Sequence, residues 1–238
     1  MSGKIVILTG AGLSAESGLG TFRDEGGLWA QHRIEDVATP KGFARDPRLV
    51  HAFYNARRQQ AAEATPNAAH DALARLQQRW PDEVILVTQN VDGLHEKAGA
   101  TAIHMHGILT GALCAACDHR WPAPSEMTPQ DMCPHCHAPA ARPDIVWFGE
   151  IPYHMEAIDK HLQDCAIFAA IGTSGQVYPA AGFVAEAAQS GAETVELNLD
   201  RTEISRAFDS HHIGPATDIV PRWVDSLLTG GARRLPFV

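Results

Sequence analysis

Four short runs rich in Ile, Val and Leu are apolar at almost every position, without the alternation of polar and apolar residues that marks a half-buried strand. These runs are Lys4–Thr9, Glu83–Thr88, Ala166–Ile171 and Thr194–Leu199. Strands with this pattern are typically buried on both faces of a parallel sheet. We therefore predict that these four runs are strands of such a sheet.

Helical patterns lie between these strands. In Pro66–Trp80 apolar residues recur at three- and four-residue steps, and the alanine-rich stretch Pro179–Ser190 ends before Gly191. Two shorter stretches, Glu203–Phe208 and Val220–Leu228, also have helical character. The alternation of strands and helices predicts an α/β fold with a doubly wound parallel sheet.

Two segments interrupt this alternation. Gly18–Pro66 combines loops rich in Gly, Asp and Pro with a helical patch, and Cys114–Pro143 holds four cysteines and six prolines. Neither segment shows the pattern of the sheet strands. We interpret both as insertions into the sheet domain.

The composition narrows the class of protein. Of 238 residues, 45% are hydrophobic and 20% charged, as in an ordinary globular protein. The formal net charge of −9 disfavours nucleic acid as a partner. The longest apolar run, Cys165–Ile171, is too short to span a membrane, and the N-terminal run is too short for a signal peptide. We expect a cytoplasmic protein with reduced cysteines and no membrane partner.

Four of the five cysteines form two closely spaced pairs. Cys114 and Cys117 are separated by fifteen residues from Cys133 and Cys136, which is the C-x2-C-x15-C-x2-C spacing of a tetrahedral thiolate zinc site. Four thiolates close the coordination shell, so the zinc would be structural. The alternatives are four buried thiols or two disulfides, and three nearby histidines lie close enough to replace a cysteine. They are His119, His135 and His137.

A glycine-rich loop follows the first strand. Gly10-Ala-Gly-Leu-Ser-Ala15 is a G-x-G-x-x-A form of the dinucleotide fingerprint, in which glycines let the backbone approach a pyrophosphate at a helix N-terminus. A glycine-rich turn made only for packing is the alternative. The acidic residue usual at the end of a second strand is absent, because Gly18–Trp29 is a polar loop.

The other half of a dinucleotide must therefore be held elsewhere. Polar residues end three later strands, at Gln89–Asp92, Gly172–Ser174 and Asn198–Asp200. In open α/β sheets ligands bind beyond the carboxyl ends of the strands. Asn198 or Asp200 are candidates for the adenosine ribose hydroxyls.

Several motifs in the same order together resemble the sirtuin family, over roughly residues 3–228. They are Gly10–Gly18, Thr21–Asp24, Gly27–Trp29, Thr88–Asp92, Leu94-His95, His106-Gly107, the two cysteine pairs, Val146–Glu150 and Gly172–Ser174. The resemblance implies an NAD-dependent protein-lysine deacylase with a Rossmann-like large domain (about 1–30, 67–110 and 144–238). It also implies a small domain built from a helical insertion (about 31–66) and a zinc ribbon (about 111–143).

The resemblance also implies roles for individual residues. Residues expected to bind NAD are Gly10, Ala11, Gly12, Ser14, Ala15, Glu16, Thr21, Phe22, Arg23, Trp29, Gln89, Asn90, Val91, Asp92, Gly172, Thr173, Ser174, Asn198, Leu199, Asp200 and Ala216. Val146, Phe148 and Gly149 are expected to pair with an extended substrate by strand addition. His106 matches the catalytic base, since a neutral imidazole can take a proton from a ribose hydroxyl. His95 and His104 are its nearest competitors.

One pair of residues indicates which acyl groups the protein can accept. Tyr54 and Arg57 stand three apart, so on a helix they share a face and can grip a carboxylate together. The alternative is an amphipathic helix with its Arg in water. The pair resembles the sirtuin subclass, class III, that removes succinyl and malonyl groups, with small Ala38 leaving room for a longer chain. Acetyl-lysine is expected to remain a substrate.

Two rival functions use the same features. An NAD-consuming ADP-ribosyltransferase or glycohydrolase would need the same loop without acyl-lysine. A non-enzymatic zinc-ribbon module would bind nucleic acid or protein. The sequence near Cys114–Cys136 has no cluster of Lys and Arg, which disfavours this function. The expected partners are proteins with acylated lysines, acted on by a monomer.

Overall fold

The computed structural model describes residues 3–20 and 32–230. Its larger sheet has the strand order β3-β2-β1-β7-β8-β9, with every pairing parallel. The bounds are β1 Ile5–Thr9, β2 Val84–Thr88, β3 Ala102–His104, β7 Ile167–Ile171, β8 Glu193–Asn198 and β9 Ser210–Ile213. This is the order 3-2-1-4-5-6 of a dinucleotide-binding sheet. The predicted doubly wound α/β fold is confirmed.

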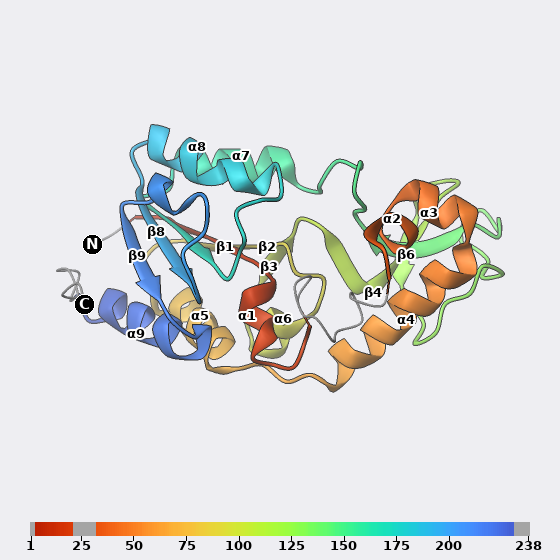
Figure 1. The fold of residues 1–238 in the computed structure, drawn as a ribbon, viewed down its shortest axis with the longest axis horizontal. Helices are drawn as coiled ribbons and strands as arrows, with labels where there is room; N and C mark the ends of the chain where they lie inside the picture. The colour runs from red at the N-terminus through yellow and green to blue at the C-terminus, as the bar shows by residue number, and fades with distance from the viewer. Residues whose placement is uncertain (1–2, 21–31, 231–238) are drawn as a thin grey trace.

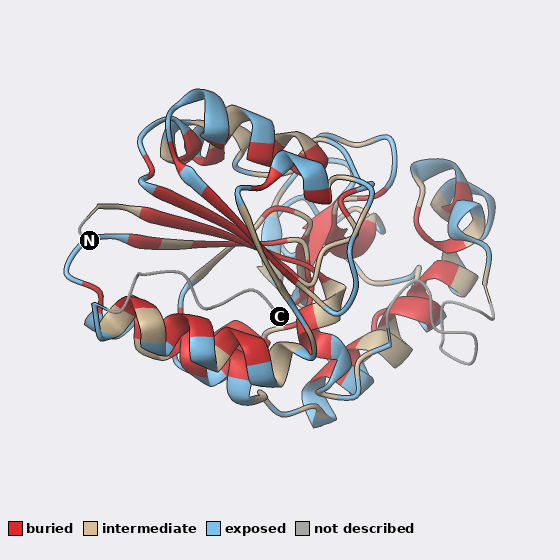
Figure 2. Cartoon of the chain, turned by 60° about the vertical axis from the view of Figure 1, so that its left-hand side comes forward, coloured by how far each residue is buried: buried red, intermediate tan, exposed pale blue. Residues whose placement is uncertain are grey.

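Helices cover both faces of this sheet (Figure 1). On one face lie α5 (Ala68–Arg79) and α9 (Ala216–Leu228), and on the other α7 (Met155–Gln163) and α8 (Phe183–Gln189). Their apolar sides and the strands form two separate buried clusters. Figure 2 shows the strands buried between the two helical layers. The continuous apolar runs are thus explained, because each strand side chain faces a helix on one face or the other.

Three of the four predicted helices are confirmed with small changes, among them Val220–Leu228, which is the C-terminal part of α9. Pro66–Trp80 is α5, whose first turn is capped by the Asn67 side chain. Pro179–Ser190 comprises the 3-10 turn η2 (Ala180–Gly182) and α8. Glu203–Phe208 holds only the 3-10 turn η3 (Ser205–Ala207).

Three helices and a second sheet form a smaller lobe (Figure 1). The helices are α2 Ile34–Val37, α3 Pro40–Arg45 and α4 Pro47–Glu63, and the antiparallel sheet has the order β5-β4-β6, with β4 Gly107–Cys114, β5 Arg120–Pro122 and β6 Ala141–Ile145. Thr39 and Asp46 cap α3 and α4 through their side chains, each followed by a proline at the first helical position. One apolar cluster joins α4 to β4, β6 and the loop after β6.

Two short helices stand at the carboxyl edge of the large sheet. They are α1 (Ala11–Ala15), directly after β1, and α6 (Leu94–Lys97), after β2. Across the ranges 3–20 and 32–230, no helix combines the length and the apolar character needed to cross a membrane.

Candidate active site

The strand order of the large sheet reverses between β1 and β7, and the loops after these two strands interlock. The Gly12 N–H donates to the Gly172 carbonyl at 2.9 Å, and the Gly10 N–H donates to the Ile171 carbonyl at 2.9 Å. A Cβ on Gly172 would lie 2.4 Å from the Leu13 nitrogen, and Gly172 has a φ of +62°. Close packing therefore requires these glycines, at the point where such sheets bind ligands.

The loop after β2 is tied to the glycine-rich loop. The Asn90 amide donates to the Gly10 carbonyl and to the Ser14 hydroxyl, both at 3.0 Å. Ser14 in turn donates to Asp92 at 3.0 Å, and the other oxygen of Asp92 accepts the Leu94 N–H that begins α6. All three polar side chains are buried. The network joins four of the residues predicted to bind NAD, namely Gly10, Ser14, Asn90 and Asp92.

Gln89 connects this network to the next two strands. Its side-chain amide donates to the Thr173 hydroxyl at 2.9 Å, and the Asn198 amide donates to the Thr173 carbonyl at 2.7 Å. The carboxyl ends of β2, β7 and β8 therefore meet, as the sequence predicted. Leu199 is 62% exposed beyond β8.

Other predicted cofactor residues are placed at the same edge or lie outside the described ranges. Glu16 accepts hydrogen bonds from the backbone and the hydroxyl of Thr217, next to Ala216 at the start of α9. Thr21, Phe22, Arg23 and Trp29 lie outside the described residues.

His106 lies between β3 and β4. Its Nδ1 is 3.1 Å from the Gln89 carbonyl oxygen. Because a carbonyl can only accept, Nδ1 carries the proton and Nε2 carries the lone pair of a base. Burial lowers the pKa of His106 and outweighs the hydrogen bond to Gln89, which raises it. The imidazole is therefore neutral at neutral pH.

The two competing histidines have other roles. His95 is 2% exposed and its Nε2 is 3.0 Å from the Thr9 hydroxyl. Burial, aided by the nearby His70, lowers the pKa of His95 to about 3. His104 has partners on both ring nitrogens, the Asn90 carbonyl at 3.2 Å and the Glu96 carboxylate at 3.1 Å. His106 is thus the best placed of the three to act as a base.

Tyr54 and Arg57 share one face of α4. The Arg57 guanidinium carbon lies 5.9 Å from the ring centres of both Phe53 and Tyr54, so the side chain folds over aromatic rings. Burial lowers the pKa of Arg57, although Tyr54 and the Asp92 carboxylate oppose this. These positions argue against the alternative of a solvated surface arginine. Ala38 is buried in the same apolar cluster as Tyr54.

The segment after β6 meets both lobes. The Val146 N–H donates to the His106 carbonyl at 2.9 Å, and the Phe148 N–H donates to the Ala38 carbonyl at 3.0 Å. These two amides are therefore engaged within the chain, and a peptide strand would have to use other polar groups of this segment. Phe148 is 47% exposed, and Gly149 has a φ of +93° with open space where a side chain would be.

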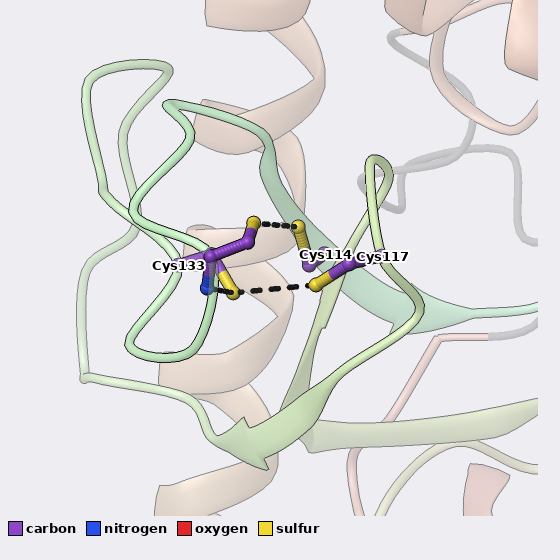
Figure 3. Close-up of side chains that lie close together, drawn as sticks. Cys114, Cys117 and Cys133 are labelled. Atoms are coloured by element: carbon purple, nitrogen blue, oxygen red, sulfur yellow. Dashed lines mark hydrogen bonds between the residues drawn. The ribbon is translucent and has the colours of Figure 1, made fainter.

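The four paired cysteines come together in the small lobe, and Figure 3 labels three of them, Cys114, Cys117 and Cys133. Their sulfurs all lie within 4.8 Å of one another, with 3.6 Å between Cys114 and Cys136 and 3.8 Å between Cys117 and Cys133. A tetrahedral zinc with bonds of about 2.3 Å places its sulfurs about 3.8 Å apart, whereas a disulfide needs about 2.05 Å. The separations fit a metal and exclude disulfides within this cluster.

Both cysteine pairs have the same backbone turn. The N–H of Cys114 bonds the His119 carbonyl and its carbonyl accepts the Asp118 N–H, while Cys133 does the same with Ala138 and His137. Asp118 and His137 both have left-handed φ values, of 57° and 58°. Two equivalent turns facing each other present four sulfurs to one point, as a zinc ribbon requires.

The sequence reasoning missed several residues around the site. Thr9 and Thr88 share a 2.9 Å hydrogen bond beneath the Asn90 loop. Arg142 and Glu150 form two hydrogen bonds, of 2.7 and 2.9 Å, across the turn after β6. Two charged residues, Arg142 and Asp144, stand at the start of the otherwise apolar segment 141–148, and they were the available signal for Arg142.

The fold and the site define a dinucleotide-binding α/β protein with a thiolate metal centre. Comparison with known proteins gives the family, because residues 10–179 match the Sir2 family. The chain belongs to the Sir2, or sirtuin, family.

Relatives and solved structures agree with this assignment. A protein from Caulobacter vibrioides called NAD-dependent protein deacylase is 53% identical, over 94% of this chain and 97% of its own length. A protein of the same name from Escherichia coli K12 is 54% identical, over 95% of this chain and 83% of its own length. A Sir2 homologue solved with NAD is 36% identical with a TM-score of 0.87, over 94% of this chain and 90% of that one. A homologue variant with 2'-O-acetyl-ADP-ribose has a TM-score of 0.88 at 35% identity, over 98% and 95%.

Proposed function

We propose that this protein is an NAD-dependent protein-lysine deacylase that removes acetyl groups and the acidic succinyl and malonyl groups. The observation that carries the proposal is the double role of Gln89. Its carbonyl fixes the His106 imidazole as a base, and its side chain reaches Thr173 in the loop after β7, at the cofactor edge. The base and the dinucleotide loops therefore form one connected site. The names of the relatives support the same reaction.

The chemistry follows from this arrangement. Bound NAD supplies a glycosidic bond whose cleavage releases nicotinamide and leaves an electron-poor carbon for the amide oxygen of an acyl-lysine to attack. His106 accepts a proton from a ribose hydroxyl through Nε2, which helps that hydroxyl oxygen attack the acyl carbon. The lysine nitrogen then leaves as the free amine, and one water molecule adds to the acyl carbon. The products are free lysine, nicotinamide and O-acyl-ADP-ribose. The phosphates are assigned to the loop at Ala11, Gly12 and Ser14. A side chain at Gly12 would displace this loop, because its Cβ would lie 2.9 Å from Gly172.

The acidic acyl groups are assigned to Tyr54 and Arg57. Arg57 binds a carboxylate through its forked N–H groups, and the Tyr54 hydroxyl adds a further donor. Burial raises the pKa of Tyr54 to about 12, so the phenol keeps its proton. Substrates are proteins with acylated lysines, and we propose that a monomer acts on them in the cytoplasm.

The four thiolates are assigned one structural zinc. The two opposed turns supply every ligand of a tetrahedral site, so no position remains for water or substrate. The metal holds the ends of β4, β5 and β6 together and takes no part in the reaction.

The test is an NAD-dependent assay on acetyl- and succinyl-lysine peptides with products identified by mass spectrometry. The wild type should form O-acyl-ADP-ribose with both peptides, and His106→Tyr should lose about 100-fold or more of both activities. His161→Tyr, on α7 at the amino side of the sheet, is the matched control and should stay active. Nicotinamide release without O-acyl-ADP-ribose would instead indicate an ADP-ribosyltransferase or glycohydrolase.

A further inference from the structure

The hydroxyl of Tyr54 has one partner fixed by the structure. Tyr54 is 1% exposed, and its oxygen lies 3.0 Å from Nε1 of Trp147, which is 2% exposed. An indole N–H can only donate, so the Tyr54 oxygen must be the acceptor in this bond. The phenolic O–H can then donate to a different group. Its preferred direction lies in the plane of the tyrosine ring and points away from the indole. Trp147 thus decides which way the Tyr54 proton points.

Trp147 is itself held from several directions. The Arg142 guanidinium carbon lies 3.5 Å from the indole ring centre, and the Phe43 ring centre lies 5.1 Å away. The backbone N–H of Trp147 donates to the Glu150 carboxylate at 2.8 Å, and Arg142 donates to the same carboxylate. A side chain with these contacts has little rotational freedom. It can therefore orient a neighbour at a small cost in entropy.

Trp147 also lies within the segment assigned to the substrate. Its neighbours Val146 and Phe148 are tied to His106 and to Ala38 by their backbone N–H groups. The indole therefore connects the catalytic loop to the helix that carries Tyr54 and Arg57. We propose that Trp147 is a positioning residue for acyl selectivity: its Nε1–H fixes the Tyr54 hydroxyl as a donor toward the carboxylate of an acidic acyl-lysine.

This inference rests on the proposed function of Tyr54 and Arg57. An acetyl group has no carboxylate to accept the Tyr54 proton, so its turnover does not depend on the direction of that proton. A carboxylate accepts one hydrogen bond from Tyr54 only when the O–H is turned toward it. Loss of the indole N–H lets the hydroxyl rotate, and succinyl-lysine binding weakens while acetyl-lysine turnover continues.

The test compares kcat and KM of Trp147→Phe for succinyl- and acetyl-lysine peptides at saturating NAD. We expect KM to rise about fivefold more for the succinyl peptide than for the acetyl peptide, which is the worth of one hydrogen bond. Equal losses on both peptides would mean that Trp147 only packs, and would overturn the proposal. A wild type without activity on the succinyl peptide would instead refute the acyl assignment itself.

A double-mutant cycle with Tyr54→Phe separates orientation from packing. If Trp147 acts through the Tyr54 hydroxyl, adding Trp147→Phe to Tyr54→Phe should not change the succinyl-to-acetyl ratio further. An additive change would overturn the proposal, because it would show that the two residues act independently.

If Trp147→Phe does not fold, an experiment on protein that retains Trp147 tests the same proposal. In protein labelled with 15N-tryptophan, one indole N–H signal in the NMR spectrum should move in Tyr54→Phe. In the wild type, the same signal should move when a succinyl-lysine peptide is added. It should not move when an acetyl-lysine peptide is added. The absence of such a signal would overturn the proposal.

Discussion

At the scale of single residues, Arg57 is the side chain whose chemistry is easiest to isolate. Its guanidinium lies over two aromatic rings of its own helix, so removing its charge leaves the helix core in place. We expect Arg57→Met to lower kcat/KM for succinyl-lysine peptide by on the order of 10- to 100-fold, since hydrogen bonds to a charged group are lost. Activity on acetyl-lysine peptide should fall only a few fold.

The matched control is Arg48→Met, an exposed arginine of the same helix, which should change neither activity. Steady-state rates on both peptides check the outcome. Equal losses on the two substrates would show that Arg57 does not bind the carboxylate.

The residue scale also shows what the sequence could and could not predict. Tyr54 and Arg57 are three apart on one helix, so their common face followed from helical periodicity. Trp147 is 93 positions away from Tyr54 and meets it only through the folded chain. No local pattern contains such a contact, and the same holds for Thr9 and Thr88, which are joined across two strands.

At the scale of elements, the junction of the loops after β1 and β7 depends on Gly172. An alanine there would combine a strained left-handed backbone with a Cβ 2.4 Å from the Leu13 nitrogen. We expect Gly172→Ala to lower the free energy of unfolding by about 3 kcal/mol or more and to abolish NAD binding, since strain and overpacking add.

Gly191→Ala is the matched control, because Gly191 has a φ of +89° with nothing within 4 Å of a Cβ. It should cost only the backbone strain, about 1 to 2 kcal/mol. Urea unfolding and NAD titration measure both effects. Equal losses of stability in the two variants would show that the loop junction tolerates a side chain.

The cysteine turns are a second element whose stability can be tested. β4 ends at Cys114 and β6 begins at Ala141, and these two residues pair with each other. The metal therefore closes this end of the small sheet. We expect Cys133→Ala to lose the bound zinc, lower the melting temperature and reduce deacylation, because the remaining thiolates no longer complete the site. Zinc content by elemental analysis and thermal unfolding measure this.

Cys165→Ala is the control for this variant, since Cys165 is buried among the residues beneath α7 and α8 and does not belong to the cluster. It should keep one zinc per chain. Full zinc content and an unchanged melting temperature in Cys133→Ala would contradict the assignment of the four ligands.

The elements differ in how well the sequence predicts them. The strands β1, β2, β7 and β8 are continuous apolar runs, and each was predicted to within one residue of its observed ends. The edge strands β3 and β9 were missed. β3 has three residues, and β9 reads Ser-His-His-Ile, so neither carries an apolar run. Their pairing with β2 and β8 makes them strands.

At the scale of the whole molecule, one sheet edge gathers segments that are far apart in the sequence. That the strand ends meet was predictable, because parallel strands all place their carboxyl ends on one edge. The order in which the strands lie was not, since no residue pattern states which apolar run pairs with which. The loops after β1, β2, β7 and β8 became one site only through that order.

The folded molecule also holds several histidines neutral, which makes its stability depend on pH. One of them is His95, whose pKa is lowered to about 3 by burial, with His70 and His104 acting in the same direction and Glu96 opposing. In the unfolded chain its pKa is near 6.5, so the unfolded state binds more protons between pH 6.5 and 3. Stability due to His95 is therefore complete above pH 6.5 and is lost as the pH falls toward 3.

We expect wild-type protein to lose on the order of 2 kcal/mol of unfolding free energy through His95 alone between pH 7 and pH 5. His95→Gln cannot take up a proton, so its stability should fall less steeply over this range, while still falling because burial also lowers the pKa of His70 and His51. His161→Gln, at the other edge of the sheet, is the control and should follow the wild type. Urea unfolding at each pH measures the slopes. Parallel curves of unfolding free energy against pH for wild type and His95→Gln would contradict this prediction. They would mean that His95 takes up its proton in the folded state as readily as in the unfolded state. The buried contact with Thr9 would then not depend on a neutral ring.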